Sequence, residues 1–289
     1  MTQLVAVVGA TGLQGGSVVK ALYAEGKYRI RALTRNPEGS SAKSLEQKYP
    51  GIEIVRADLD SFESLQQAFK GADVVFGVTQ FFQKDILDKV ESGDTDAEFT
   101  QGKAMVDAAI AEGVQSMVFS GLPSMNKISG GKYTKVLHFE GKHRVEQYLL
   151  SKADKIRGYP VHAGSYMQNY TGFARRSAED NAIEFSLVLG PNDTLPLTDI
   201  ESDLGKIVVY ILEHPEECLG KPMAVCSGYF KAQDMVKAFT EVTGVPARYV
   251  QIPYEYLGSE DLAQMFHGFR EFNIFDGMTD FAEYYGKRG

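Results

Sequence analysis

Gly9-Ala10-Thr11-Gly12-Leu13-Gln14-Gly15 lies between the apolar run 4–8 and the segment 17–22, and this order decides the fold. The unbroken apolar run predicts a fully buried strand, and the segment 17–22 has the pattern of a helix. A strand, a glycine turn and a helix in this order are typical of a dinucleotide site. A turn that binds nothing is the weaker interpretation.

Each glycine of the turn has its own expected role. Gly9 should permit the tight turn, Gly12 should let the backbone approach a pyrophosphate, and Gly15 should let the helix pack close to the strand. The helix N-terminus would offer free N–H groups and a positive dipole end to the phosphates. The expected contacts in this turn are Gly9, Thr11, Gly12, Leu13, Gln14 and Gly15.

The end of the second expected strand indicates which dinucleotide binds. NAD sites usually carry Asp or Glu about 20 residues past the glycines, where it accepts the ribose 2′-hydroxyl. Here the strand 28–34 is followed by Arg35, whose guanidinium can lie against a 2′-phosphate. We therefore expect NADP(H) to be preferred, while the nearby Glu38 leaves NAD(H) open. The alternative for Arg35 is a solvated surface side chain.

The first half of the chain alternates between strand and helix signals, which predicts an α/β fold with a Rossmann-type, doubly wound parallel sheet. Strands are expected at 4–8, 28–34, 52–56, 73–78, 116–120 and 159–163, and helices at 17–22, 62–69, 95–112 and 140–150. The strand order should reverse near the first and fourth strands, which places the cofactor at their carboxyl ends.

After residue 164 the alternation ends, which divides the chain into two expected parts. Residues 1–155 are expected to form the NAD(P)-binding domain, with later strands returning to its sheet. Residues 156–289 are expected to form a smaller C-terminal α/β lobe for substrate or partner, which covers the reactive end of the cofactor. In this lobe, short helices are expected at 203–212 and 232–243, with loops between them.

The composition excludes several classes of protein. The 289 residues carry a net charge of −8 without a basic stripe, which argues against direct nucleic-acid binding. Only two cysteines are present, which fits a reducing cytoplasmic setting and leaves the nucleus open. No apolar run is long enough to span a bilayer, and the N-terminal run is too short for a signal peptide. The five histidines are scattered, so no metal site is expected.

Loops at the carboxyl ends of the other strands should line the same crevice. Asp58 and Leu59 follow the third expected strand and should approach the adenine, although Asp58 is equally suited to capping a helix. Val78 and Thr79 follow the fourth strand and should pass near the ribose.

Three segments, the glycine turn with Gly16, Leu33–Pro37 and His138–Lys142, together resemble the NmrA-like family. This family is an atypical branch of the short-chain dehydrogenases and reductases, and the resemblance covers essentially the whole chain. The segment 162–169 resembles the family's segment after the sixth strand, which implies cofactor contacts for Tyr166 and Asn169. The family contains redox-sensing regulators as well as quinone or isoflavone-type reductases.

An active reductase of this superfamily uses Tyr-x-x-x-Lys, in which the Tyr donates a proton and the Lys lowers its pKa and holds the ribose. By the resemblance, Lys142 occupies the Lys position and His138 occupies the Tyr position. Lys142 is expected to bind the ribose, and a solvated lysine is its alternative. His138 could donate a proton, but packing or capping at the helix start is the preferred interpretation.

The missing Tyr favours a NADP(H)-binding redox sensor that reports cofactor state to a protein partner, without efficient turnover. By resemblance to the family's fungal regulator, the partner would be a zinc-finger transcription factor or another regulatory protein. The rival is a NADPH-dependent reductase of a quinone or conjugated carbonyl, and a third reading is a cofactor-stabilised scaffold. The sequence is compatible with a monomer and with a homodimer. The segments 80–95 and 125–135 are expected to be mobile loops beside the cofactor.

Overall fold

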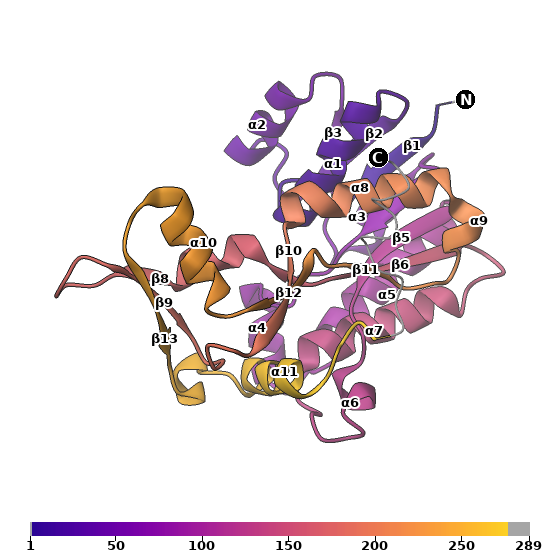
Figure 1. Cartoon of the computed structure of the whole chain (residues 1–289). Coiled ribbons are helices and arrows are strands. Elements are labelled where there is room, and N and C mark those ends of the chain that lie inside the picture. Colours follow the sequence, from indigo (N-terminus) through magenta and orange to yellow (C-terminus); the bar gives the residue numbers. More distant parts are fainter. Residues whose placement is uncertain (1, 277–289) are drawn as a thin grey trace.

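A seven-stranded parallel sheet forms the centre of the computed structural model, which describes residues 2–276 (Figure 1). All six predicted strands form, and a seventh joins them at one edge. Across the sheet the strands are β11 (Met223–Val225), β6 (Arg157–Ala163), β5 (Ser116–Gly121), β4 (Val74–Gly77), β1 (Leu4–Val7), β2 (Arg29–Thr34) and β3 (Glu53–Arg56). Because β1 lies between β2 and β4, the predicted reversal of strand order is confirmed.

Helices cover both faces of this sheet, which confirms the doubly wound architecture. On one face lie α1 (Leu13–Glu25), α2 (Ser40–Lys48), α8 (Ile200–Glu213) and α9 (Pro215–Cys218). On the other face lie α3 (Phe62–Phe69), α5 (Ala97–Ala111) and α7 (Leu137–Leu150). Two separate apolar clusters result, one on each side of the strands.

The position of α8 differs from the prediction. The sequence placed a helix at 203–212 in the small lobe, but α8 packs along α1 against the central sheet (Figure 1). A Cβ atom at Gly205 would lie 2.1 Å from the carbonyl oxygen of Ser17, so glycine is what lets the two helices approach. The Ser17 hydroxyl accepts a hydrogen bond from the Gly205 amide at 3.0 Å and donates one to the Glu201 carbonyl at 3.1 Å.

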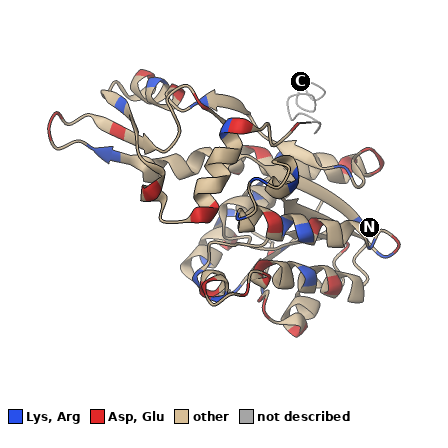
Figure 2. Cartoon of the chain, turned by 90° about the horizontal axis from the view of Figure 1, so that it is seen from below, with Lys and Arg blue, Asp and Glu red and all other residues tan. Residues whose placement is uncertain are grey.

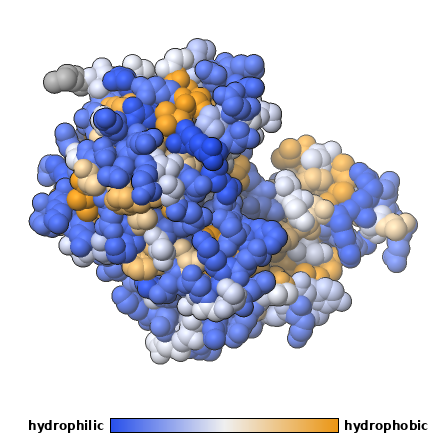
Figure 3. All heavy atoms as spheres, turned by 180° about the vertical axis from the view of Figure 1, so that it is seen from behind, coloured by the Kyte–Doolittle hydropathy of each residue, from blue (hydrophilic) through white to orange (hydrophobic). Residues whose placement is uncertain are grey.

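The small lobe contains two three-stranded sheets, in keeping with the predicted α/β lobe, although only its short helices and none of these strands were located from the sequence. One sheet has the order β12 (Gly228–Lys231), β10 (Thr194–Thr198), β7 (Ser165–Tyr166), and the other has β13 (Ala247–Gln251), β9 (Ile183–Leu187), β8 (Ala174–Arg176). The second sheet and α10 (Asp234–Thr243) form an arm that stands out from the body. Figure 3 shows a notch between this arm and the body. The remaining elements are η1 (Met167–Phe173), η2 (Tyr254–Leu257) and α11 (Glu260–Glu271).

Two of the predicted loops beside the crevice contain helices. The segment 80–95 includes α4 (Lys84–Glu91), whose Ile86 is fully buried, and the segment 125–135 begins with α6 (Met125–Ile128). The prediction of a loop over 80–95 was therefore wrong for residues 84–91, which form α4. Acidic and basic residues are interspersed along the elements of the body and the arm in Figure 2. No helix within residues 2–276 has both the length and the apolar character that crossing a membrane requires.

Candidate cofactor site

The glycine turn has the geometry that its sequence predicts. Gly9 adopts a left-handed backbone conformation with φ of +64°, and its carbonyl accepts a hydrogen bond from the Gly12 amide at 2.9 Å. A Cβ atom at Gly15 would lie 2.3 Å from the carbonyl oxygen of Gly9, so only glycine lets α1 start this close to β1.

The first turn of α1 is open to a ligand. Gly12 is the N-cap residue and has no side chain to bond the first amides of the helix. Thr11, Gly12 and Leu13 are all exposed at this point. The turn therefore presents free N–H groups and the positive end of the helix dipole to solvent, which is the arrangement that a pyrophosphate requires.

The residues after β2 and β3 lie at the same edge of the sheet. Arg35 is exposed directly after β2. Asp58 does not cap α3, because the Ser61 hydroxyl accepts the Ser64 amide at 3.2 Å in that role. The Asp58 carboxylate instead closes a turn by accepting the Asp60 amide at 3.1 Å. Leu59, half-buried, packs against the apolar cluster beneath.

A charge from Arg35 reaches the loop after β3. Burial of the Asp60 carboxyl raises its pKa, but hydrogen bonds from Gln101 and Lys89 and the charges of Lys89 and Arg35 together hold the pKa below its ordinary value. The Lys89 ammonium and the Gln101 amide each lie 3.1 Å from the same Asp60 oxygen. Asp60 thus links the edge of the crevice to α4 and α5.

Tyr166 lies against the glycine turn, and its hydroxyl accepts a hydrogen bond from the Gln14 side chain. Burial raises the pKa of Tyr166, while the Gln14 hydrogen bond acts in the opposite direction. The resemblance predicted cofactor contacts for both Tyr166 and Asn169. Tyr166 lies against the glycine turn, whereas Asn169 is exposed in η1. The contact brings the start of the small lobe to the N-terminus of α1.

Lys142 lies buried under the loop after β4 and points into a cluster of oxygen atoms. Its ammonium donates to the Thr79 carbonyl at 3.0 Å, to the Thr79 hydroxyl at 3.1 Å and to the Glu98 carboxylate of α5. Glu98 is 2% exposed and also accepts the Thr79 hydroxyl at 2.8 Å. A lysine ammonium has three protons, and this cluster provides an acceptor for each of them.

His138 is held by the far end of the chain. Its Nδ1 lies against the Asp261 carboxylate of α11, and its backbone amide donates to the same carboxylate at 3.1 Å. The imidazole is buried, and its centroid lies 5.1 Å from the Phe82 ring and 5.8 Å from the Phe81 ring. Because Val136 offers no side-chain cap, Asp261 satisfies the start of α7 from another lobe.

The sequence did not single out Glu98 or Asp261, although they are the partners of both candidate catalytic residues. Glu98 could have been found, since it shares a helical face with Gly102, Met105 and Ala109, where a carboxylate implies a buried partner. Asp261 gave no such signal, because acidic residues are ordinary in a first helical turn. Among the residues described, no group of three or more His, Cys, Asp and Glu side chains could hold a metal ion.

Nearly the whole chain is similar in sequence to one family of known proteins. The model of the NmrA-like family matches residues 1–284. An NmrA-like domain-containing oxidoreductase of Aspergillus campestris is 33% identical over 283 residues, which cover 91% of this chain and 81% of the relative. A similarly named oxidoreductase of Cladobotryum is 32% identical over 262 residues, covering 86% of this chain and 76% of the relative.

Solved structures of the negative transcriptional regulator NmrA have the same fold. Its complex with NADP has a TM-score of 0.79 at 23% identity, and the match covers 99% of this chain and 91% of the regulator. Its complex with NAD has a TM-score of 0.76 at 24% identity and covers 92% of this chain and 81% of the regulator.

Proposed function

This chain belongs to the NmrA-like family, and on that premise we propose that it binds NADP(H) and reports the state of the cofactor to a protein partner. The residues fit the cofactor, since the turn lacks a Cβ at Gly12 and Gly15 and leaves the first amides of α1 open. The regulator NmrA has been crystallised with NADP and with NAD, which supports dinucleotide binding here. When bound, the cofactor supplies a hydride or accepts one.

The proposed contacts divide by part of the dinucleotide. The glycine turn takes the pyrophosphate, Arg35 takes the 2′-phosphate, and Asp58 and Leu59 border the adenine. Val78, Thr79 and Lys142 border the ribose of the nicotinamide, and Lys142 exchanges one of its internal acceptors when it binds there. Tyr166 and Asn169 close the crevice from the small lobe.

One observation carries the sensor over the enzyme: both candidate catalytic side chains face an internal carboxylate. Lys142 is paired with Glu98, and His138, which replaces the reductase Tyr, is paired with Asp261. Neither group is poised toward a substrate oxygen. The His138 pairing also connects the crevice with α11, so a change beside the cofactor has a route to the small lobe.

The experiment is a calorimetric titration of the full chain with NADP⁺, NADPH, NAD⁺ and NADH, followed by limited proteolysis with and without each cofactor. We expect NADP(H) to bind and to change cleavage within 80–95 and 125–135, the two segments that flank the crevice. Binding of no dinucleotide would overturn the proposal. Binding without any change in cleavage would leave a cofactor-stabilised scaffold in its place.

A NADPH-dependent reductase of a quinone or conjugated carbonyl is the second candidate, and the names of the fungal relatives favour it. The exposed Phe82 beside His138 could contact a flat apolar substrate. NADPH oxidation with a quinone decides between the two, since turnover on the order of 1–10³ per second belongs to an enzyme.

For the sensor, the proposed partner is a zinc-finger transcription factor or another regulatory protein in the cytoplasm or nucleus.

A further inference from the structure

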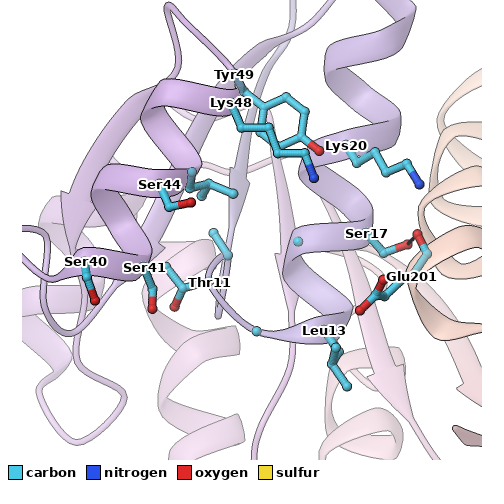
Figure 4. A pocket seen from close by; sticks show the side chains of 14 residues that line it. Thr11, Leu13, Ser17, Lys20, Ser40, Ser41, Ser44, Lys48, Tyr49 and Glu201 are labelled. Carbon is cyan, nitrogen blue, oxygen red and sulfur yellow. Dashed lines mark hydrogen bonds between the residues drawn. The ribbon is translucent and has the colours of Figure 1, made fainter. Parts of the chain in front are cut away.

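A groove between α1 and α2 continues from the glycine turn along the outer side of both helices. It has a volume of about 690 Å³, which is within the range of sites for small organic ligands. Thr11, Ser40 and Ser41 lie at the end beside the glycine turn, and Lys20 and Lys48 lie at the opposite end (Figure 4). The pyrophosphate cradle therefore occupies only one end of a longer groove.

The far end of the groove is cationic and lacks an internal partner. Lys48 extends from α2 across the groove toward α1, which carries Lys20 (Figure 4). Both lysines are exposed, and neither forms an ion pair with a carboxylate within residues 2–276. The one acidic residue of the lining, Glu201, lies toward the glycine-turn end beside Leu13. In a chain of net charge −8, two neighbouring unpaired cations favour an anion between them.

The remaining lining matches an organic phosphate rather than a bare ion. The hydroxyl of Ser44 lies midway along the groove and has no hydrogen-bond partner in the described part of the chain. Leu45 and the buried ring of Tyr49 give the wall an apolar part, and the Lys48 ammonium lies 5.5 Å from the centroid of that ring. Ammonium and hydroxyl donors suit the several oxygens of a phosphate, while the wall suits the carbon part of an ester.

We propose that the far end of this groove, formed by Lys20, Lys48 and Ser44, binds a small phosphate ester in addition to the dinucleotide. The site lies along the outer sides of α1 and α2, whereas a dinucleotide lies across the carboxyl ends of the strands. A second phosphorylated ligand can therefore bind while the cofactor is in place. Its affinity is set by exposed charges, so it falls as the ionic strength rises.

The test uses the full chain saturated with NADP⁺, so that the dinucleotide site is filled. Calorimetric titration at low ionic strength should detect binding of ribose 5-phosphate, and weaker binding of inorganic phosphate, which has no carbon part to contact the apolar wall. In the double variant Lys20→Gln/Lys48→Gln we expect the affinity for both ligands to fall by roughly tenfold or more, as the loss of charge-assisted hydrogen bonds implies. Lys237→Gln, which neutralises an exposed lysine on α10, is the matched control and should leave both affinities unchanged.

Each other result overturns the proposal. If NADP⁺ abolishes the binding of both ligands, the groove belongs to the dinucleotide site. If the double variant loses affinity for NADP⁺ itself, the lysines serve the cofactor. If Lys237→Gln weakens binding as much as the double variant does, the ligands respond only to net charge. Should the chain bind no dinucleotide, the same titrations without NADP⁺ test the groove independently of the proposed function.

Discussion

Two buried side chains at the candidate crevice, Lys142 and His138, each lie against a carboxylate from another element of the protein. Burying an ion pair is costly unless its remaining hydrogen-bonding groups are satisfied. The Lys142 ammonium meets that condition with both oxygens of Thr79, whereas Oε2 of Glu98 is buried without a hydrogen-bond partner in the described part of the chain. The pairing fixes the loop after β4 to α5 and α7. The same interactions that hold the loop also withhold the ammonium from solvent.

A double-mutant cycle on Lys142 and Glu98 tests this pairing. Lys142→Met should lower the free energy of unfolding by about 3–5 kcal/mol, because it leaves the Glu98 carboxylate buried without its cation. The double variant Glu98→Gln/Lys142→Met should recover part of this loss, since no charge remains buried. Urea denaturation measures both. Strictly additive effects of the two substitutions would show that the side chains do not interact.

The choice of dinucleotide is expected to depend on Arg35. A charge-assisted hydrogen bond to the 2′-phosphate contributes about 1.5–3 kcal/mol, which is roughly a ten- to hundredfold preference for NADP⁺ over NAD⁺. Arg35→Ser should reduce that preference and leave the NAD⁺ affinity nearly unchanged, as measured by calorimetry. Arg176→Ser, which removes an arginine from the arm, is the control. Equal affinities of the natural chain for both cofactors would contradict this role.

At the scale of single residues, the sequence predicts local backbone geometry, but it does not predict pairings between residues that are far apart in the chain. The glycine turn follows from backbone rules within seven residues, so Gly9 and Gly15 have their predicted conformations and contacts. The Lys142 and His138 partners are 44 and 123 residues away in the chain. No periodicity relates residues at such distances, so only the fold brings these carboxylates to the site.

The six predicted strands of the body and its helices α1, α3, α5 and α7 could be located from apolar runs and helical patterns in the sequence, whereas α2 and α9 were not predicted. The buried runs gave the six strands, and α3 begins and ends at the predicted residues. The strands of the small lobe were not located, since all six are short, with two to five residues, and irregular segments separate them. The placement of α8 was missed for a different reason. The apolar face of a helix does not by itself show which element it packs against, and here the close approach to α1 depends on Gly205.

The contact between α1 and α8 is therefore expected to be sensitive to volume at Gly205. Gly205→Ala should lower the free energy of unfolding by about 1–3 kcal/mol, because the new methyl group overlaps the Ser17 carbonyl and forces the helices apart. Thermal or urea denaturation measures the effect. Gly172→Ala is the matched control, since a Cβ there has no heavy atom within 4 Å. Equal free energies of unfolding for the two variants would show that α8 can move to accommodate the methyl group without loss of stability.

In the arm, an arginine of β13 is bonded to β9 and to the connection between β8 and β9. Arg248 of β13 bonds Glu184 of β9, and also Asp180 and Ser177 of the β8–β9 connection. Hydrogen bonds from Arg248 and Arg175 lower the pKa of Glu184. The pKa of Asp180 is lowered by a hydrogen bond from the Ala182 backbone amide and, to a smaller extent, by one from Arg248. Because both folded-state values are lowered, this stabilisation is present at neutral pH and is lost as pH falls through them.

An NMR titration of the two carboxyl groups tests the role of Arg248. In the natural chain both should titrate below their ordinary range, which is about 4 for Asp and Glu. In Arg248→Met both midpoints should rise toward that range, and the arm should be cleaved faster by protease at neutral pH. Lys237→Met on α10 serves as the control. Unchanged midpoints in Arg248→Met would assign the shifts to other groups.

Across the whole molecule, α11 connects the small lobe with the edge of the cofactor crevice. Besides Asp261, it holds the segment before α7 through Gln264, which accepts the Lys135 amide at 2.9 Å, and through Glu271, which accepts the Tyr133 hydroxyl at 2.8 Å. His138 in turn contacts Phe82, which follows β4. Cofactor binding and the small lobe are thus joined through packed and hydrogen-bonded groups.

Asp261→Asn is expected to separate cofactor binding from its effect on the small lobe. The amide oxygen still accepts the His138 amide, but the carboxylate beside the imidazole is removed. NADP⁺ affinity should change little, whereas the cofactor should no longer alter proteolysis within 125–135. Glu260→Gln, the neighbouring residue on α11, is the control. If Asp261→Asn responds to NADP⁺ as the natural chain does, this contact does not transmit the signal.

The return of α8 and β11 to the body has a consequence for how the protein is made. The edge of the sheet at β6 stays unpaired until β11 emerges from the ribosome about 60 residues later, and the face of α1 that packs on α8 stays uncovered for about 175 residues. At about 5–20 residues per second, these surfaces of the nascent chain are exposed for roughly 3–12 s and roughly 9–35 s. Protection by chaperones during synthesis is therefore expected to limit the yield of this protein more than its final stability does.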